Sequence, residues 1–378
     1  MRLLALVLIL AILTGCSLVP DTYLSVEDHI VPQTQKTQSD EVTVRDYSEL
    51  KRAILSFVEA GQTEGTIWTS NYDGPLEEDL LQASYEVSKL NPLGAYAVDY
   101  MTHDCTFIVN YYEITVRITF RRTLREIESI EPIATQSLLQ SRLEQALEQH
   151  ETRLALRSAN YRGWDVAAMV EEYCAAHPDT MMEQPNVTLS VYPDSGTIRI
   201  LEIDLQYTHT AQELERMEDA VQESVDAAAE YIRYRQSDRE KTDLLFTYLM
   251  ERFTYVEGTT ATPLYDALCA GIADPAGLAH AWQLICDTAG VPCYTVTGLR
   301  NGQPHTWNIV GNDGYFRHVD LPQCMLKRGT LVLQDDLSMG DYYWNTEQLP
   351  ACTPYPEDTA PIAEQASIQS EEDTPVQP

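Results

Sequence analysis

The sequence is short of basic residues. It has 25 Lys and Arg against 58 Asp and Glu, which gives a formal net charge of -33 over 378 residues. A surface of this sign repels the phosphates of nucleic acids and the headgroups of anionic lipids. The composition therefore argues against DNA or RNA as a partner. It would suit a cationic partner, or it would simply keep the chain in solution, which is the commoner use of such charge.

Long apolar runs are also lacking. The one strongly apolar run covers residues 3–13, whereas a membrane-spanning helix needs about 20 apolar residues. Arg2 precedes the run and small residues follow it, which is the layout of a secretory signal peptide. Residues 13–16, Leu-Thr-Gly-Cys, resemble a lipobox, the cleavage signal of bacterial lipoproteins. That resemblance implies a signal peptide ending in a lipidated Cys16; the alternative is an ordinary signal peptide with an incidental cysteine.

A lipidated Cys16 would place the protein outside the cytoplasm. We expect it to be exported and anchored at the outer face of the cytoplasmic membrane, or in an outer membrane where the envelope has one. Residues 17–40 are polar and are expected to form a flexible tether, and residues 351–378 a disordered acidic tail. The expected partners are the membrane, through the lipid, and a peptide, a protein or a cell-wall ligand.

Cysteine pairs with the spacing of zinc sites are missing too. None of the eight cysteines forms a CxxC pair, so neither a metal nor another cofactor is predicted. Seven cysteines remain besides Cys16, and an odd number cannot pair completely within one chain. An exported location would permit disulfides. Cys286 and Cys293 occur in apolar patterns and are expected to be small buried side chains.

Two stretches of the chain show the same order of predicted elements. Each has a helix, a strand, an Asn-Tyr-x-Gly turn, a second helix and two more strands. The turns begin at Asn71 and Asn160, 89 positions apart (160 minus 71). Apolar positions keep this offset: Leu50 and Leu139, Ile54 and Leu143, Ile67 and Leu156.

This pattern predicts two tandem α+β repeats, at residues 41–125 and 130–208. The alternative is a chance similarity between two α+β stretches. In the first stretch, the last two strands are expected at residues 95–101 and 111–121. Neither copy contains a cluster of residues that suggests chemistry, so the repeats would act as spacers, packing partners or a binding surface.

The third part of the chain, residues 209–350, combines helices with a possible catalytic layout. Helices are expected at residues 211–234 and 238–252. A further helix begins with Asp274 as its cap and Pro275 as its first residue, and antiparallel strands follow. A helix start followed by strands that bear His305 and then Asp320 is typical of a thiol catalytic site. The thiol lies at the helix N-terminus, the histidine is the base and the aspartate orients it.

Several ordered stretches here resemble the transglutaminase-like core, a papain-type cysteine fold. They are residues 238–241, 264–271, 277–279, 289–293, 296–298, 305–308 and 318–320. The resemblance covers about residues 211–325 and implies an α+β domain in which a helix packs on an antiparallel sheet. It assigns His305 and Asp320 to the catalytic pair. The family's cysteine stands four residues after a glycine, and counting from Gly271 this position holds Pro275.

Proline cannot act as a nucleophile, so the resemblance implies a domain that has lost catalysis. We expect a binding or scaffold module at the cell envelope, in which the remnant pair His305 and Asp320 holds two strands together without chemistry. The alternative is an active enzyme of amide hydrolysis or transfer. It would use a substitute nucleophile, either Cys269 or Asp274, although capping a helix is a simpler role for Asp274.

Other polar side chains of this part have weaker interpretations. His280 is expected to be a packing or surface residue, and Trp307 and Asn308 to support their strand. His318 could join the remnant pair around a metal, but the sequence offers no clear third ligand. A third functional reading places the binding surface on the repeats, with the last domain as a packed end.

Overall fold

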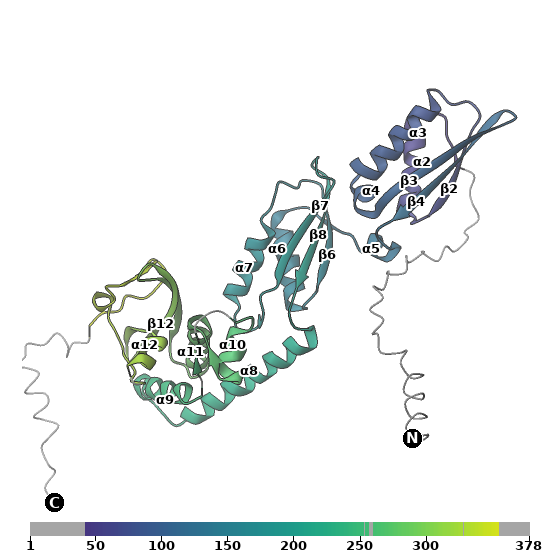
Figure 1. Ribbon diagram of the computed structural model, residues 1–378. Coiled ribbons are helices and arrows are strands. Elements are labelled where there is room, and N and C mark those ends of the chain that lie inside the picture. Colours follow the sequence, from purple (N-terminus) through teal and green to yellow (C-terminus); the bar gives the residue numbers. More distant parts are fainter. Residues whose placement is uncertain (1–41, 253, 257–259, 328, 355–378) are drawn as a thin grey trace, which may run out of the picture. The chain divides into compact units, whose positions relative to one another are not determined.

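The computed structural model describes residues 42–252, 254–256, 260–327 and 329–354 (Figure 1). The predicted signal peptide, Cys16, the tether and most of the acidic tail lie outside these residues. The chain divides into two compact units, Met1–Glu131 with Val191–Ile200, and Pro132–Ser190 with Leu201–Pro378. Among the helices that the structure describes, none combines the length and the apolar character needed to cross a bilayer.

The first module places helices against a mixed four-stranded sheet of order β1-β2-β4-β3. Helix α2 buries Leu50, Ile54 and Phe57 along one face, the spacing expected of an amphipathic helix. The elements are β1 (Val42–Thr43), α2 (Tyr47–Glu59), β2 (Glu64–Thr69), α3 (Leu76–Tyr85), η1 (Glu86–Leu90), α4 (Pro92–Ala97), β3 (Val98–Ile108), β4 (Tyr111–Phe120) and α5 (Leu124–Glu128).

The strand expected at residues 95–101 begins later than predicted. Asn91 caps α4 through its side chain, which accepts from the backbone N–H groups of Leu93 and Gly94, and Pro92 occupies the first turn. Because this cap starts a short helix, residues 95–97 are helical and β3 begins at Val98.

The second module has a sheet of the same kind, of order β5-β6-β8-β7. When the strands of each sheet are numbered in chain order, both sheets have the spatial order first, second, fourth, third. Leu156 of β6 is fully buried, as is Ile67 of β2. That the two modules are repeats of one unit stays a prediction. The elements are β5 (Glu131–Ile133), α6 (Gln136–Glu148), β6 (Arg153–Ser158), α7 (Val166–Ala176), β7 (Asn186–Tyr192) and β8 (Arg199–Gln206).

The last part of the chain is α+β, with helix α11 packed on an antiparallel sheet of order β13-β12-β11-β14. The fold class predicted from the sequence is thus confirmed. The elements are α8 (Ala211–Ile232), α9 (Asp238–Met250), β9 (Thr254–Tyr255), α10 (Pro263–Tyr265), η2 (Asp266–Ala270), β10 (Ile272–Ala273), α11 (Pro275–Thr288), β11 (Cys293–Arg300), β12 (Gln303–Asn312), β13 (Tyr315–Val319), α12 (Leu321–Leu326), η3 (Asp336–Ser338) and β14 (Tyr342–Trp344).

The turn between β11 and β12 consists of two residues. Strand β11 continues to Arg300, which pairs with Gln303 of β12. The two residues between them, Asn301 and Gly302, have φ values of 50° and 76°. Positive φ at both central residues is the requirement of a type I′ hairpin, for which Asn-Gly is a preferred sequence.

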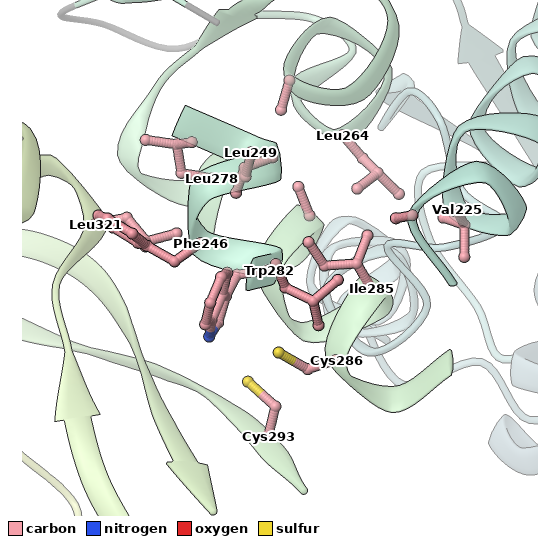
Figure 2. Close-up of a cluster of buried hydrophobic side chains, with 14 of the residues drawn as sticks. Val225, Phe246, Leu249, Leu264, Leu278, Trp282, Ile285, Cys286, Cys293 and Leu321 are labelled. Atoms are coloured by element: carbon pink, nitrogen blue, oxygen red, sulfur yellow. The ribbon is translucent and has the colours of Figure 1, made fainter. Parts of the chain in front are cut away.

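The main core lies between α11 and the helices around it. Trp282 projects from the middle of α11 into this core beside Phe246 of α9, with Leu249 and Ile285 close by (Figure 2). These side chains are at most 4% exposed. Each such buried side chain contributes roughly 1.5–3 kcal/mol relative to an exposed one. The core therefore holds α11 firmly against its neighbours.

The opposite face of the same sheet is also covered. Trp307 and Ile309 alternate with Asn308 and Val310 along β12, so the two pairs face opposite sides of the sheet. Val310 belongs to the main core, whereas Trp307 and Ile309 pack with residues of the C-terminal segment 332–354. Cys352, which the sequence placed in the acidic tail, is 2% exposed and belongs to this second cluster.

Candidate functional site

The structure brings His305 and Asp320 together. His305 lies on β12, and Asp320 follows β13 directly and caps α12, where its Oδ1 accepts from the backbone N–H of Gln323 at 3.2 Å. The His305 Nε2 and Asp320 Oδ2 atoms are 2.8 Å apart. Both side chains are largely shielded from water, at 11% and 1% exposed. The pairing leaves Nδ1 of His305 as the nitrogen available to a second group.

Asp320 is held as a carboxylate by donors on several sides. Burial by itself would raise the pKa of Asp320, but the hydrogen bonds from His305 and Tyr342 lower it overall. The Tyr342 hydroxyl donates to Oδ2 at 2.5 Å, and burial together with this bond raises the pKa of Tyr342 well above its usual value. A charged, buried Asp320 fixes the orientation of the His305 ring, as the third member of a catalytic triad does.

The register of α11 on the sheet indicates where the helix begins. The carbonyl of Ala279 accepts from Asn308 Nδ2 at 2.9 Å. About two helical turns later, Cys286 packs in the same core as Val310 and Cys293, which are paired across β12 and β11. Moving toward the helix start thus means moving along β12 from residue 310 toward 305. Pro275, four residues before Ala279, is therefore at the end of the sheet that carries His305.

Asp274 acts as the cap of α11. Its Oδ1 accepts from the backbone N–H of Gly277 at 2.6 Å, and the residue is 1% exposed. Its Oδ2 is buried and has no hydrogen-bond partner in the described part of the chain. No hydrogen bond or ion pair with His305 is found there either. The geometry thus supports the helix cap, not the substitute nucleophile.

Cys269 lies apart from the His–Asp pair. It is exposed on η2, and its Sγ is 3.5 Å from Ser224 Oγ of α8. Partial burial of the thiol raises the pKa of Cys269, which lowers its thiolate fraction at neutral pH. Among the described residues, the hydrogen bonds of Cys269 and His305 involve different partners. The structure therefore does not bring this cysteine into the site.

His318 is part of a separate hydrogen-bonded cluster. Its Nδ1 accepts from the Trp307 indole N–H at 3.0 Å, and its Nε2 is 2.9 Å from Asp336 Oδ1. Accepting at Nδ1 requires a neutral ring that carries its proton on Nε2. Burial accordingly lowers the pKa of His318, and Asp336 opposes this shift only in part. The metal site considered with His305 and Asp320 is not assembled, because His318 faces Asp336.

His318, Asp336 and Cys352 have possible ligand atoms within 4.8 Å of one another. A histidine that binds a metal through Nε2 normally donates its Nδ1 proton to a neighbour. Here Nδ1 faces a donor, the Trp307 N–H, so the ring is arranged for hydrogen bonding to Asp336. The backbone N–H of Cys352 also donates to Asp336, at 3.1 Å. The cluster thus fastens the C-terminal segment to β13.

Two residues of the site were missed by the sequence analysis, Tyr342 and Asp336. Both come from the C-terminal segment and reach the sheet from positions distant in sequence. The signal available was the aromatic run at residues 342–344, in which Tyr342 packs edge-on to Trp307 at 5.1 Å and Trp344 to His318 at 4.7 Å. Such a run beside the predicted acidic tail indicates a segment that packs.

The chain was compared with protein-family models, curated proteins and solved structures. No family model and no curated protein match it. Solved structures that match include a TGase, with 13% identity, a TM-score of 0.26, and coverage of 58% of this chain and 63% of that one. Another is a proposed protease from Parabacteroides distasonis ATCC 8503, with 8% identity, a TM-score of 0.23, and coverage of 68% and 40%.

A third is a proposed cysteine protease from Cytophaga hutchinsonii, with 13% identity, a TM-score of 0.25, and coverage of 43% and 71%. The chain covers less than two thirds of the first two of these proteins. The helix α11, the antiparallel sheet and the His305–Asp320 pair are described above from this chain alone. Together they form an α+β arrangement of a helix packed on an antiparallel sheet, which is the fold class that the sequence predicts for this part of the chain.

Proposed function

We propose that the transglutaminase-like core is a non-catalytic module that binds a partner at the cell envelope. One observation carries the proposal: α11 begins with Pro275 at the end of the sheet that carries His305. In an enzyme of this design the helix start supplies a thiol whose pKa is lowered by the helix dipole and the histidine. Proline supplies neither a thiol nor a side-chain proton.

The environments of Asp274 and Cys269, the two candidate substitute nucleophiles, support the same conclusion. Asp274 uses one oxygen as a helix cap, and Cys269 is exposed on η2 beside Ser224. The orienting pair is nevertheless intact, because Asp320 is also the cap of α12 and the partner of Tyr342. Because these contacts stabilise the fold, the His305–Asp320 pair is retained even without catalysis. The module would offer the surface around His305 to a peptide, a protein or a cell-wall ligand.

Turnover measurements on the full chain test the loss of catalysis. Amide hydrolysis of fluorogenic peptides and incorporation of a labelled amine into a glutamine peptide are measured for the wild type and His305→Ala. We expect no difference between them, since no nucleophile depends on His305. The matched control is His177→Ala, an exposed histidine after α7. Wild-type turnover that His305→Ala abolishes and His177→Ala preserves would overturn the proposal in favour of an active enzyme.

The envelope location rests on residues 13–16 and is tested at Cys16. Cells that express the full chain are fed a labelled fatty acid, and the protein is then isolated. Wild type is expected to carry the label and to sediment with membranes, whereas Cys16→Ala carries none and is released. Cys105→Ala, a partly exposed cysteine of β3, is the control that keeps the label. Equal labelling of the Cys16→Ala protein would rule out the lipobox interpretation.

A further inference from the structure

Cys286 and Cys293 are neighbours in the main core. Cys286 lies in the last turn of α11 and Cys293 is the first residue of β11. Figure 2 shows the two sulfur atoms side by side, one from the helix and one from the strand. Their exposed fractions are 0% and 5%, so both thiols face protein. The sequence analysis expected two small buried side chains and did not pair them.

The connection between α11 and β11 brings the two residues together. The helix ends at the Ala289 cap, and Gly290 adopts a positive φ of 72°, which glycine tolerates best. The next backbone N–H, that of Val291, then donates to the Cys286 carbonyl at 2.9 Å. This tight turn returns the chain beside the last helical turn, where the Cys293 thiol lies close enough to contribute to the raised pKa of Cys286.

Two other buried cysteines, Cys324 and Cys352, have other neighbours. Cys324 accepts from the backbone N–H of Val332 at 3.4 Å, and the Cys352 thiol is 3.9 Å from the Pro350 carbonyl. Burial, and after it the neighbouring Cys293, raises the pKa of Cys286. A buried thiol of raised pKa reacts poorly with dissolved reagents. Cys286 therefore reacts most readily while the chain folds, and its nearest sulfur is that of Cys293.

We infer that Cys286 and Cys293 form an intramolecular disulfide when the chain folds in the presence of a disulfide oxidant. One cysteine thiolate attacks a sulfur of the oxidant and releases one thiol of it. The other cysteine then attacks the mixed disulfide and releases the second thiol. In sum, two cysteine thiols and one oxidant disulfide give one protein disulfide and two small thiols. An exported location would supply such oxidants.

This disulfide would connect the end of α11 covalently to the start of β11. The position of α11 along the sheet determines which of its side chains lie near His305. By fixing the C-terminal end of α11 to β11, the disulfide would also hold the N-terminal end of the helix in place. The inference does not depend on whether the core is catalytic. It assigns a cross-linking site within the chain.

Peptide mapping of the full chain tests the inference. The protein is folded with oxidised glutathione and, in parallel, with dithiothreitol, and free thiols are then alkylated in denaturant. A protease that cleaves before aspartate cuts at Asp274, Asp287 and Asp313, and so separates the two cysteines into peptides 274–286 and 287–312. We expect these peptides to be linked in the oxidised protein and separate and alkylated in the reduced protein.

Two variants make the assignment specific. Cys293→Ser should abolish the linked peptides, and Cys324→Ser should preserve them. The thermal midpoint of the oxidised wild type should lie several degrees above that of the reduced protein, because the cross-link restricts the unfolded chain. The inference would be overturned if the oxidised wild type gave alkylated, unlinked peptides at 274–286 and 287–312. This outcome is measured on the wild type alone, so it does not depend on whether the variants fold.

Discussion

At the scale of single residues, the site keeps its orienting groups without a nucleophile. Asp320 accepts from His305, from Tyr342 and from the backbone N–H of Gln323. Replacing it would leave buried donors without an acceptor, which costs about 1–3 kcal/mol per group. Its persistence beside Pro275 is therefore explained by stability, and the His–Asp pair alone does not indicate an enzyme.

Restoring a thiol at position 275 should give a reactive cysteine. Pro275→Cys places the thiol at the start of α11, where the helix dipole and His305 favour the thiolate. We expect its apparent pKa, from the pH dependence of iodoacetamide labelling, to fall below the free value of about 8.5. The pKa of Cys269 is raised, so that cysteine serves as a slow reference in the same chain.

Adding His305→Ala to this variant should slow the labelling at neutral pH and move the apparent pKa upward. Labelling of the restored thiol that is as slow as that of Cys269, and independent of His305, would show that position 275 does not face the histidine.

His318 should make the protein less stable in mild acid. Its pKa is lowered in the folded state from an ordinary 6.5, so below that pH the unfolded chain binds more protons. The stabilising contribution is therefore complete above pH 6.5 and is lost as the pH falls below it. Urea unfolding at a series of pH values from neutral to mildly acidic measures this slope. Partly buried His280, whose pKa is also lowered, adds to it.

The slope should decrease in His318→Gln and remain in His177→Gln. An unchanged slope in His318→Gln would mean that His318 titrates equally in the folded and unfolded chains.

At the scale of elements, helix α11 connects the end of the sheet that carries His305 with the main core. Gly277 in its first turn has room for no side chain, because an added Cβ would lie 2.5 Å from the Pro263 carbonyl oxygen. The close approach of α10 at this point depends on that glycine. The start of α11 is thus determined by Asp274, Pro275 and Gly277 together.

Loss of the Asp274 cap should destabilise this helix start. Asp274→Ala removes the acceptor for the Gly277 N–H and should lower the free energy of unfolding by about 1 kcal/mol, with a range of about 0.5–2. Asp274→Asn keeps the acceptor and, because Oδ2 has no partner, should be nearly neutral. Denaturant unfolding distinguishes the two variants. Equal losses would indicate that the charge of Asp274 has a role beyond capping.

The sequence predicted α11 and its three following strands well, because each has local signals. Asp274 and Pro275 mark the helix start, Gly290 its end, and Asp313-Gly314 a hairpin. The pairing of His305 with Asp320 followed from a resemblance, since nothing local places these two residues together. The aromatic run at residues 342–344 indicated a packed segment, but the bond of Tyr342 to Asp320 and the mutual approach of Cys286 and Cys293 could not be predicted, because they depend on how elements pack and not on any periodicity.

At the scale of the whole molecule, the excess of acidic residues should weaken the folded state. A net charge of -33 makes the compact chain repel itself, and salt screens this repulsion over about 10 Å at 0.1 M. We expect the urea midpoint of unfolding to rise from low to moderate ionic strength. Sodium and potassium chloride should act alike if screening is responsible. A midpoint that is independent of salt would show that the charges are already well separated or paired.

The C-terminal segment also has a consequence for how the protein is made. Trp307 and Ile309 are covered by Met339, Trp344 and Cys352, which are among the last described residues of the chain. Until those residues have been synthesised, this face of the sheet stays open, and its apolar side chains are available to chaperones or to other chains. Completion of this core must therefore wait until Met339, Trp344 and Cys352 have emerged. A premature stop anywhere before residue 339 would leave a sheet with one uncovered apolar face and would favour aggregation.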